Sequence, residues 1–229
     1  MRRQTLVLST VLLALPCGAT AQEAARGRAQ QVLPAAVFQQ VDALARDAVA
    51  AGIPDDILFN KALEGMAKRV PQDRLVPAVQ AYAGRLREAQ AAFGGGQDAP
   101  MLVAGADALQ RGVRAEALRG LHQSEGHSPM AVLVLAELVE TGVPEERALD
   151  LVREGLAQRM HDQEMLDMSA RVRGMMRQGQ SAQDATEQMR RMLQRRGGGG
   201  MSPPVPPGSE PMTNERLRGM GRPGGGHLG

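Results

Sequence analysis

The chain has little aromatic or thiol chemistry. Its 229 residues include one cysteine (Cys17), no tryptophan, one tyrosine and three phenylalanines. A single cysteine cannot form a disulfide within the chain. If Cys17 is removed with a leader peptide, thiolate catalysis and cysteine metal sites are excluded as well. The core must then be filled by alanine, leucine, valine and methionine, whose modest size suits closely packed helices.

The first 21 residues are typical of a secretory signal peptide. Residues 2–3 are both arginine, residues 6–15 are apolar, and Ala-Thr-Ala at 19–21 provides small residues for cleavage. The apolar stretch is shorter than the roughly 20 residues that cross a bilayer. Lipoprotein anchoring through Cys17 is disfavoured, because Pro16 stands directly before it. We therefore predict an exported protein of the bacterial envelope, either periplasmic or secreted.

A turn-and-helix motif occurs twice, 90 residues apart. GIPDD at 52–56 corresponds to GVPEE at 142–146, and EGMA at 64–67 corresponds to EGLA at 154–157. Glycine ends a helix easily, proline can begin one, and acids suit the positive end of its dipole. The motif therefore predicts one helix ending, a tight corner and a second helix beginning. Its marker residues are Gly52, Pro54, Glu64 and Gly65 in the first copy and Gly142, Pro144, Glu154 and Gly155 in the second.

Two marker glycines are expected inside helices. Glycine in a helix interior costs about 1 kcal/mol relative to alanine. We therefore expect a neighbouring helix to approach closely at Gly65 and Gly155.

The spacing of apolar residues is helical throughout, with no alternating strand pattern. It predicts an all-α domain over 34–196 of stacked antiparallel helix pairs, either α-solenoid-like or a compact duplicated helical domain. Residues 22–33 are expected to be a loose lead-in, and the Gly-rich stretch 94–97 to be a subdomain break or a loop. The Gly/Pro-rich tail, 197–229, is expected to be disordered. The predicted helices are 34–51, 54–69, 71–92, 98–111, 114–123, 128–141, 144–160, 162–178 and 181–196.

Charge is unevenly distributed along the chain. Residues 22–170 hold 15 basic and 21 acidic residues, whereas residues 171–229 hold 10 basic and 4 acidic. Such asymmetry can mark a docking tail, although arginines also suit a helix C-terminus. Nucleic acid is not an expected partner, because export separates the two and no aromatic follows Phe93 to stack on bases.

Two groups of residues could hold a metal. His122 and His127 flank Glu125, but the five-residue spacing and Gly126 favour a surface loop. Methionines are frequent late in the chain and could bind Cu(I), fill the core or form an adaptable contact surface. They are Met160, Met165, Met168, Met175, Met176, Met189, Met192, Met201, Met212 and Met220.

The sequence shows no arrangement typical of a catalytic site. There is no nucleophile motif or phosphate-binding loop, and the acidic pairs at 55–56 and 145–146 are explained by helix capping. We therefore predict no enzyme, no cofactor and no metal. The favoured function is an exported interaction or scaffold module, whose partner is an envelope protein or an anionic envelope surface. The alternative is a periplasmic metal-binding or chaperone-like stress protein.

Overall fold

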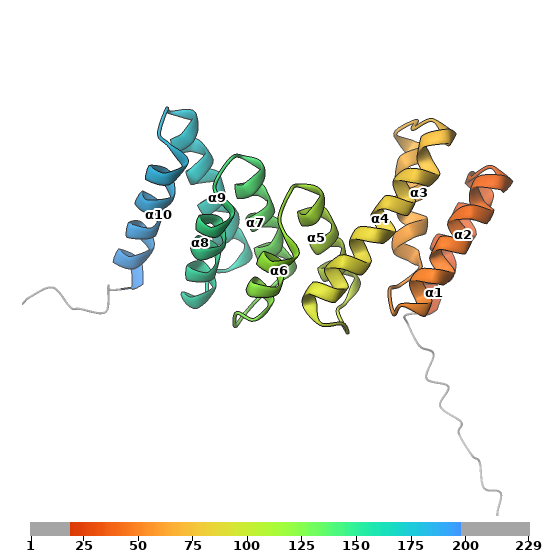
Figure 1. Cartoon of the computed structure of the whole chain (residues 1–229), viewed down its shortest axis with the longest axis horizontal. Coiled ribbons are helices and arrows are strands. Elements are labelled where there is room, and N and C mark those ends of the chain that lie inside the picture. Colours follow the sequence, from red (N-terminus) through yellow and green to blue (C-terminus); the bar gives the residue numbers. More distant parts are fainter. Residues whose placement is uncertain (1–18, 198–229) are drawn as a thin grey trace, which may run out of the picture.

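The computed structural model describes residues 19–197, which form ten α-helices (Figure 1). The all-α prediction is confirmed. The helices are α1 (Ala19–Val32), α2 (Ala35–Ala50), α3 (Asp56–Ala67), α4 (Gln72–Phe93), α5 (Ala99–Gln110), α6 (Ala115–His122), α7 (Pro129–Glu140), α8 (Glu145–Ala157), α9 (Asp162–Arg177) and α10 (Ala182–Gly197).

The helices pack in sequential antiparallel pairs, from α1/α2 to α9/α10, as in an α-solenoid. Figure 1 shows α1 and α10 at opposite ends of the row. The even-numbered helices stack in order along one layer, each on the next. In the odd-numbered layer α1 packs on α3, α5 on α7 and α7 on α9, whereas α3 and α5 have little contact with each other. The stack of odd-numbered helices is therefore interrupted once within the described chain.

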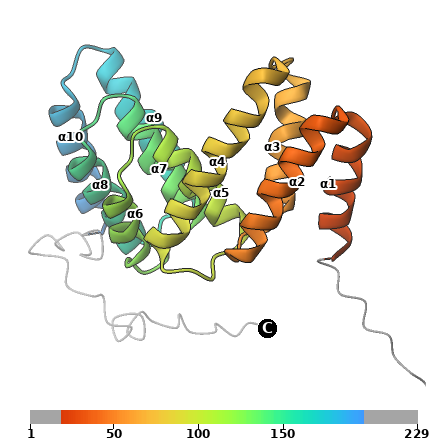
Figure 2. The ribbon, with the colours of Figure 1, turned by 45° about the vertical axis from the view of Figure 1, so that its right-hand side comes forward.

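The described part of the chain has two clusters of buried residues, which meet at α4 and α5. One cluster of buried residues joins α1, α2, α3 and parts of α4 and α5, and a second joins the rest of α4 and α5 to α6–α10. Figure 2 shows α4 passing between these two groups of helices. Gly105 of α5 lies directly against Ala89 and Phe93 of α4. The loop at 94–97 thus connects two helices that remain tightly packed.

Seven corners between helices share one hydrogen-bonding pattern. The first residue past the corner donates its N–H to a carbonyl five residues earlier, and the residue before it donates to a carbonyl three residues earlier. This is the Schellman ending, which satisfies carbonyl groups left free at a helix terminus. The paired residues are Gly52/Ile53, Arg69/Val70, Gly94/Gly95, Gly112/Val113, Gly142/Val143, Arg159/Met160 and Gly179/Gln180.

The proline corners follow the prediction closely, but the prolines lie just outside the helices. Pro144 occupies the N-cap of α8, and Pro71 the N-cap of α4. In the first copy α3 begins only at Asp56, with Asp55 as the N-cap. Pro77 lies inside α4, which continues as one helix from Gln72 to Phe93.

The loose lead-in predicted for residues 22–33 is wrong. This segment belongs to α1, and Ala25, Ala29 and Leu33 are buried against the neighbouring helices. Its buried contacts come mainly from small alanines, so the apolar periodicity that marks a helix is weak. The predicted signal peptide falls mostly, and the predicted tail almost wholly, outside the described residues.

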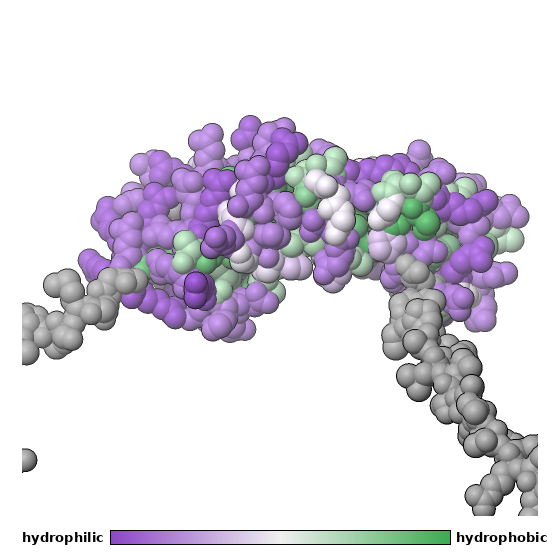
Figure 3. Space-filling view, turned by 90° about the horizontal axis from the view of Figure 1, so that it is seen from below, coloured by the Kyte–Doolittle hydropathy of each residue, from purple (hydrophilic) through white to green (hydrophobic). Residues whose placement is uncertain are grey.

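Most of the described surface is polar. Seen from below, it is mainly hydrophilic with small separate apolar patches (Figure 3). Among the described residues, the large exposed apolar side chains are Val32, Val49, Leu166 and Met192. No helix in this part of the chain combines the length and apolar character needed to cross a bilayer.

Candidate functional site

The interruption between α3 and α5 leaves a groove of about 450 Å³, which we call the acidic groove. Tyr82 of α4, which is buried, also lines it. Three of its lining residues are carboxylates and one is a lysine, so its net charge is negative. The lining residues are Asp56, Ile57, Asn60, Lys61 and Glu64 of α3, Tyr82 of α4, and Ala99, Pro100, Val103 and Asp107 of α5.

Charged side chains in the groove are arranged around the Tyr82 ring. Lys61 Nζ lies 4.9 Å from the ring centre and 3.0 Å from Glu64 Oε2. Lys68 pairs with the other Glu64 oxygen, as the four-residue spacing predicts. The hydrogen bond from Lys68, followed by that from Lys61, lowers the pKa of Glu64. Glu64 therefore carries its charge at the rim of the groove at neutral pH.

Tyr82 is held neutral by its surroundings. Only 3% of its surface is exposed, and burial raises its pKa to about 12, with Asp107 and Glu64 adding to the effect. Asp56 and Asp107 make no ion pair with any described residue. The groove thus presents two uncompensated carboxylates beside an aromatic ring and apolar side chains, a suitable lining for a cation with an apolar stem.

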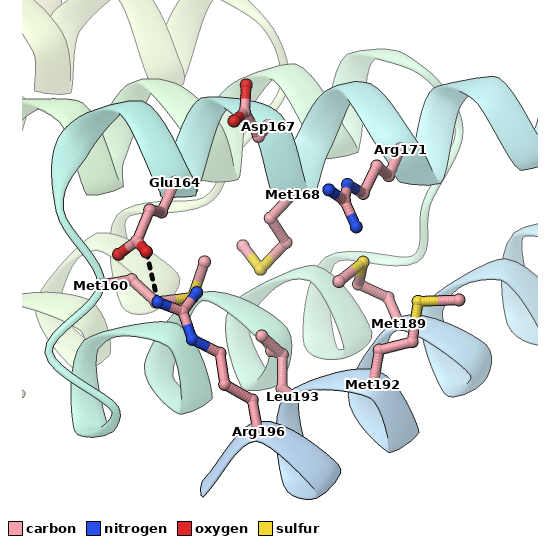
Figure 4. Close-up of a pocket in the computed structure, with 9 residues that line it drawn as sticks. All are labelled: Met160, Glu164, Asp167, Met168, Arg171, Met189, Met192, Leu193 and Arg196. Carbon is pink, nitrogen blue, oxygen red and sulfur yellow. Dashed lines mark hydrogen bonds and ion pairs between the residues drawn. The ribbon is translucent and has the colours of Figure 1, made fainter.

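A second hollow, which we call the methionine pocket, has a volume of about 240 Å³ and lies between α9 and α10. Figure 4 shows the Met168 and Met189 side chains directed toward each other across it, and the Glu164–Arg196 ion pair closing one side. Met168 and Met189 are almost fully buried, whereas Met192 is 40% exposed. The pocket is lined by Met160, Glu164, Asp167, Met168, Arg171, Met189, Met192, Leu193 and Arg196.

His122 and His127 lie together. Their ring centres are 4.3 Å apart in an edge-to-face arrangement, and Phe93 packs against His122 at 5.4 Å. Burial, and then the charge of His127, lower the pKa of His122. The described residues contain no cluster of three or more histidine, cysteine, aspartate or glutamate side chains placed to hold a metal.

The marker residues of the duplicated motif occupy separate places. Gly52 and Gly142 take positive φ values of 80° and 93° at their corners. At Gly65, an added Cβ would lie 2.4 Å from Leu75 Cδ1; at Gly155, it would lie 2.8 Å from Met165 Sδ. The expected close approach at Gly65 and Gly155 is therefore present, and it is made by side chains of the following helix.

The two marker glutamates differ in their partners. Glu64 lines the acidic groove, whereas Glu154 Oε2 lies 3.4 Å from Arg190 Nε of α10. Tyr82 and Asp107 were not singled out from the sequence, although Tyr82 is the only tyrosine of the chain. The sequence carries no direct signal for the groove, because it arises from the spacing of helices that are not consecutive.

Capping alone does not account for the acids of the second motif. Glu145 begins α8, but its carboxylate accepts hydrogen bonds of 2.8 Å from both the backbone N–H and the side-chain Nε of Arg114. The acid thus ties the α7/α8 corner to the α5/α6 corner and has a structural role.

Comparison with protein-family models, with curated proteins and with solved structures finds no match to this chain. Its function is therefore inferred from the geometry of the acidic groove and the methionine pocket.

Proposed function

We propose that the chain is an exported, non-enzymatic interaction module of the bacterial envelope that binds a segment of a partner protein in the acidic groove. One observation carries the proposal: the odd-numbered stack is open between α3 and α5, and the opening is lined by carboxylates and apolar side chains together. Stacked helix pairs commonly present extended binding surfaces of this kind. The signal-peptide pattern supports the envelope as the compartment.

Site-specific photocrosslinking tests this proposal. A photoreactive residue is placed at Asn60, which is exposed and lines the groove, and, as a matched control, at Asp47, which is exposed on α2. Both proteins are irradiated in envelope extract of the producing bacterium. The proposal predicts a defined crosslinked protein at position 60 that is absent at position 47 and that also co-purifies with the unmodified chain. Equal crosslinking at both positions, or none at position 60, would contradict it.

A second candidate function is Cu(I) binding in the methionine pocket. The observation that favours it is the gathering of four methionines from the α8/α9 corner, α9 and α10 around one hollow. Thioethers are suitable ligands for Cu(I). Under anaerobic conditions, replacing Met168 and Met189 by leucine should weaken Cu(I) binding at least tenfold in competition with a chromogenic chelator. An unchanged affinity would remove this candidate and leave the methionines as core residues.

A further inference from the structure

The second copy of the duplicated motif shows how a groove of this type is filled. Residues 90 positions apart correspond in the two copies of the motif. α3 therefore corresponds to α8, Asn60 to Asp150 and Glu64 to Glu154. In the second copy α10 packs directly on α8. Its Arg190 reaches both acids: Nε lies 3.4 Å from Glu154 Oε2, and Nη2 lies 3.6 Å from Asp150 Oδ2. One half-buried guanidinium therefore pairs with two acids of α8.

The first copy lacks this arginine. Counted from the start of each helix, Arg190 is the ninth residue of α10, and the ninth residue of α5 is Asp107, which lines the acidic groove. The helix before it is also longer, since α4 has 22 residues and α9 has 16. At 1.5 Å per residue, the added length is about 9 Å. α5 packs on α4 and α7 and has little contact with α3, whereas α10 packs on α8.

We propose that the acidic groove receives an arginine side chain from a partner protein, in the position that Arg190 takes in the second copy. This inference rests on the proposed function and specifies the chemistry of the partner. The guanidinium would lie between Asp107 of α5 and the acids of α3, all of which line the groove. Its planar fork of donors can bind two carboxylates at once, which a lysine ammonium does less well.

The apolar part of the groove fits the same ligand. Ile57 and Val103 line it beside the acids, so the methylene stem of an arginine and a neighbouring apolar side chain can be buried with the guanidinium. In the second copy, the buried residues Met189 and Leu193 flank Arg190 on α10. We therefore expect the partner segment to carry apolar residues next to its arginine.

The chain provides both a probe and a reporter for this inference. A synthetic peptide of residues 182–197 carries Arg190 with its flanking apolar residues and contains no aromatic side chain. Tyr82 is the only tyrosine and there is no tryptophan, so intrinsic fluorescence comes mainly from the groove. The full-length chain is titrated with this peptide and with an otherwise identical peptide carrying Arg190→Gln.

We expect a saturable change in Tyr82 emission with the first peptide and at least tenfold weaker binding of the Arg190→Gln peptide. Asp107→Asn should weaken binding of the first peptide by a similar factor, whereas the matched control Asp47→Asn on α2 should leave it unchanged. The peptide comparison uses the unaltered protein, so it decides the question even if Asp107→Asn fails to fold. Circular dichroism monitors the fold of both variants.

Several results would overturn the inference. Both peptides also contain Arg191, Arg195 and Arg196, so equal binding would mean that the groove does not select an arginine at the place of Arg190. The photocrosslinking at Asn60 would still test the proposed function separately. No response to either peptide at millimolar concentration would exclude an arginine site. If a chain that ends at Gly197 bound the peptide more tightly than the full-length chain, residues 198–229 would be the natural occupant of the groove. If Tyr82 emission changed with protein concentration in the absence of peptide, the natural occupant of the groove would be a second copy of the chain.

Discussion

The close contact between α4 and α5 gives a sharp test of the packing described above. An added Cβ at Gly105 would lie 2.8 Å from Ala89 Cβ and 2.7 Å from Phe93 Cε2. Carbon atoms in contact are normally about 3.5–4.0 Å apart, so α5 would have to move by on the order of 1 Å. Ala89 Cβ is attached directly to the backbone and cannot rotate away.

Gly105→Ala therefore combines two opposing effects. Overpacking costs about 1–3 kcal/mol, and replacing a helical glycine with alanine stabilises the helix by about 1 kcal/mol. We expect a net loss of about 1 kcal/mol in the free energy of unfolding. Gly84→Ala is the matched control, because Gly84 lies in α4 and an added Cβ would contact nothing within 4 Å. That variant should gain about 1 kcal/mol.

Urea denaturation followed by circular dichroism at 222 nm measures both variants. The two should differ by about 2 kcal/mol, with wild type between them. If Gly105→Ala were as stable as wild type or more stable, the close helix contact would be refuted. Because α5 forms one wall of the acidic groove, Gly105→Ala should also change Tyr82 emission, and Gly84→Ala should not.

Three further predictions concern single residues. The absorbance at 295 nm should titrate with a midpoint near the pKa of about 12 for Tyr82 in the folded chain and near 10 in urea. Between pH 10 and 12 the folded chain retains a proton that the unfolded chain loses, so the free energy of unfolding should fall as the pH rises, by at most about 2.7 kcal/mol. Equal titration midpoints in the folded and the urea-unfolded chain would contradict the burial of the phenol. Arg159 has a φ of 54°, a left-handed conformation that glycine adopts without strain. Arg159→Gly should therefore stabilise the chain by about 0.5 kcal/mol, because relief of backbone strain outweighs the added freedom of the unfolded chain. A lower stability of this variant in urea denaturation would contradict the prediction. Asp98 accepts a hydrogen bond of 3.0 Å from the Met101 N–H at the start of α5, so Asp98→Ala should lower the thermal midpoint by the equivalent of about 1 kcal/mol, whereas Asp98→Asn should largely preserve it.

Most of the fold could be predicted because its signals are local. Glycines at corners, prolines at N-caps and apolar residues at helical spacing placed nine helices within a few residues of their observed bounds. α1 was missed because Ala25 and Ala29 give little apolar contrast in a polar segment. The positive φ of Arg69 and Arg159 was also missed, although both copies carry arginine there, because arginine is not a residue expected in that conformation.

The candidate site could not be predicted because it depends on distances between helices that are not consecutive. The sequence singled out Glu64 only as a marker of the motif, while the groove also requires Tyr82 from α4 and Asp107 from α5. The histidine pair shows the same difficulty. His122 and His127 were expected to be surface residues of one loop, whereas His122 is the last residue of α6 and its ring meets that of His127.

The two copies of the motif form equivalent helices and corners but surround them differently. In the second copy, the 16-residue α9 returns the chain so that α10 covers α8 and Arg190 meets Glu154. In the first, the 22-residue α4 carries the chain further before α5 begins; Glu64 of α3 pairs with Lys61 and Lys68, and Asp56 makes no ion pair with a described residue. The duplicated part of the sequence therefore accounts for the fold, whereas the candidate function lies where the copies differ. Shortening α4 until α5 covers α3 should then close the acidic groove and remove its capacity for an arginine, while the corners that define the fold are retained.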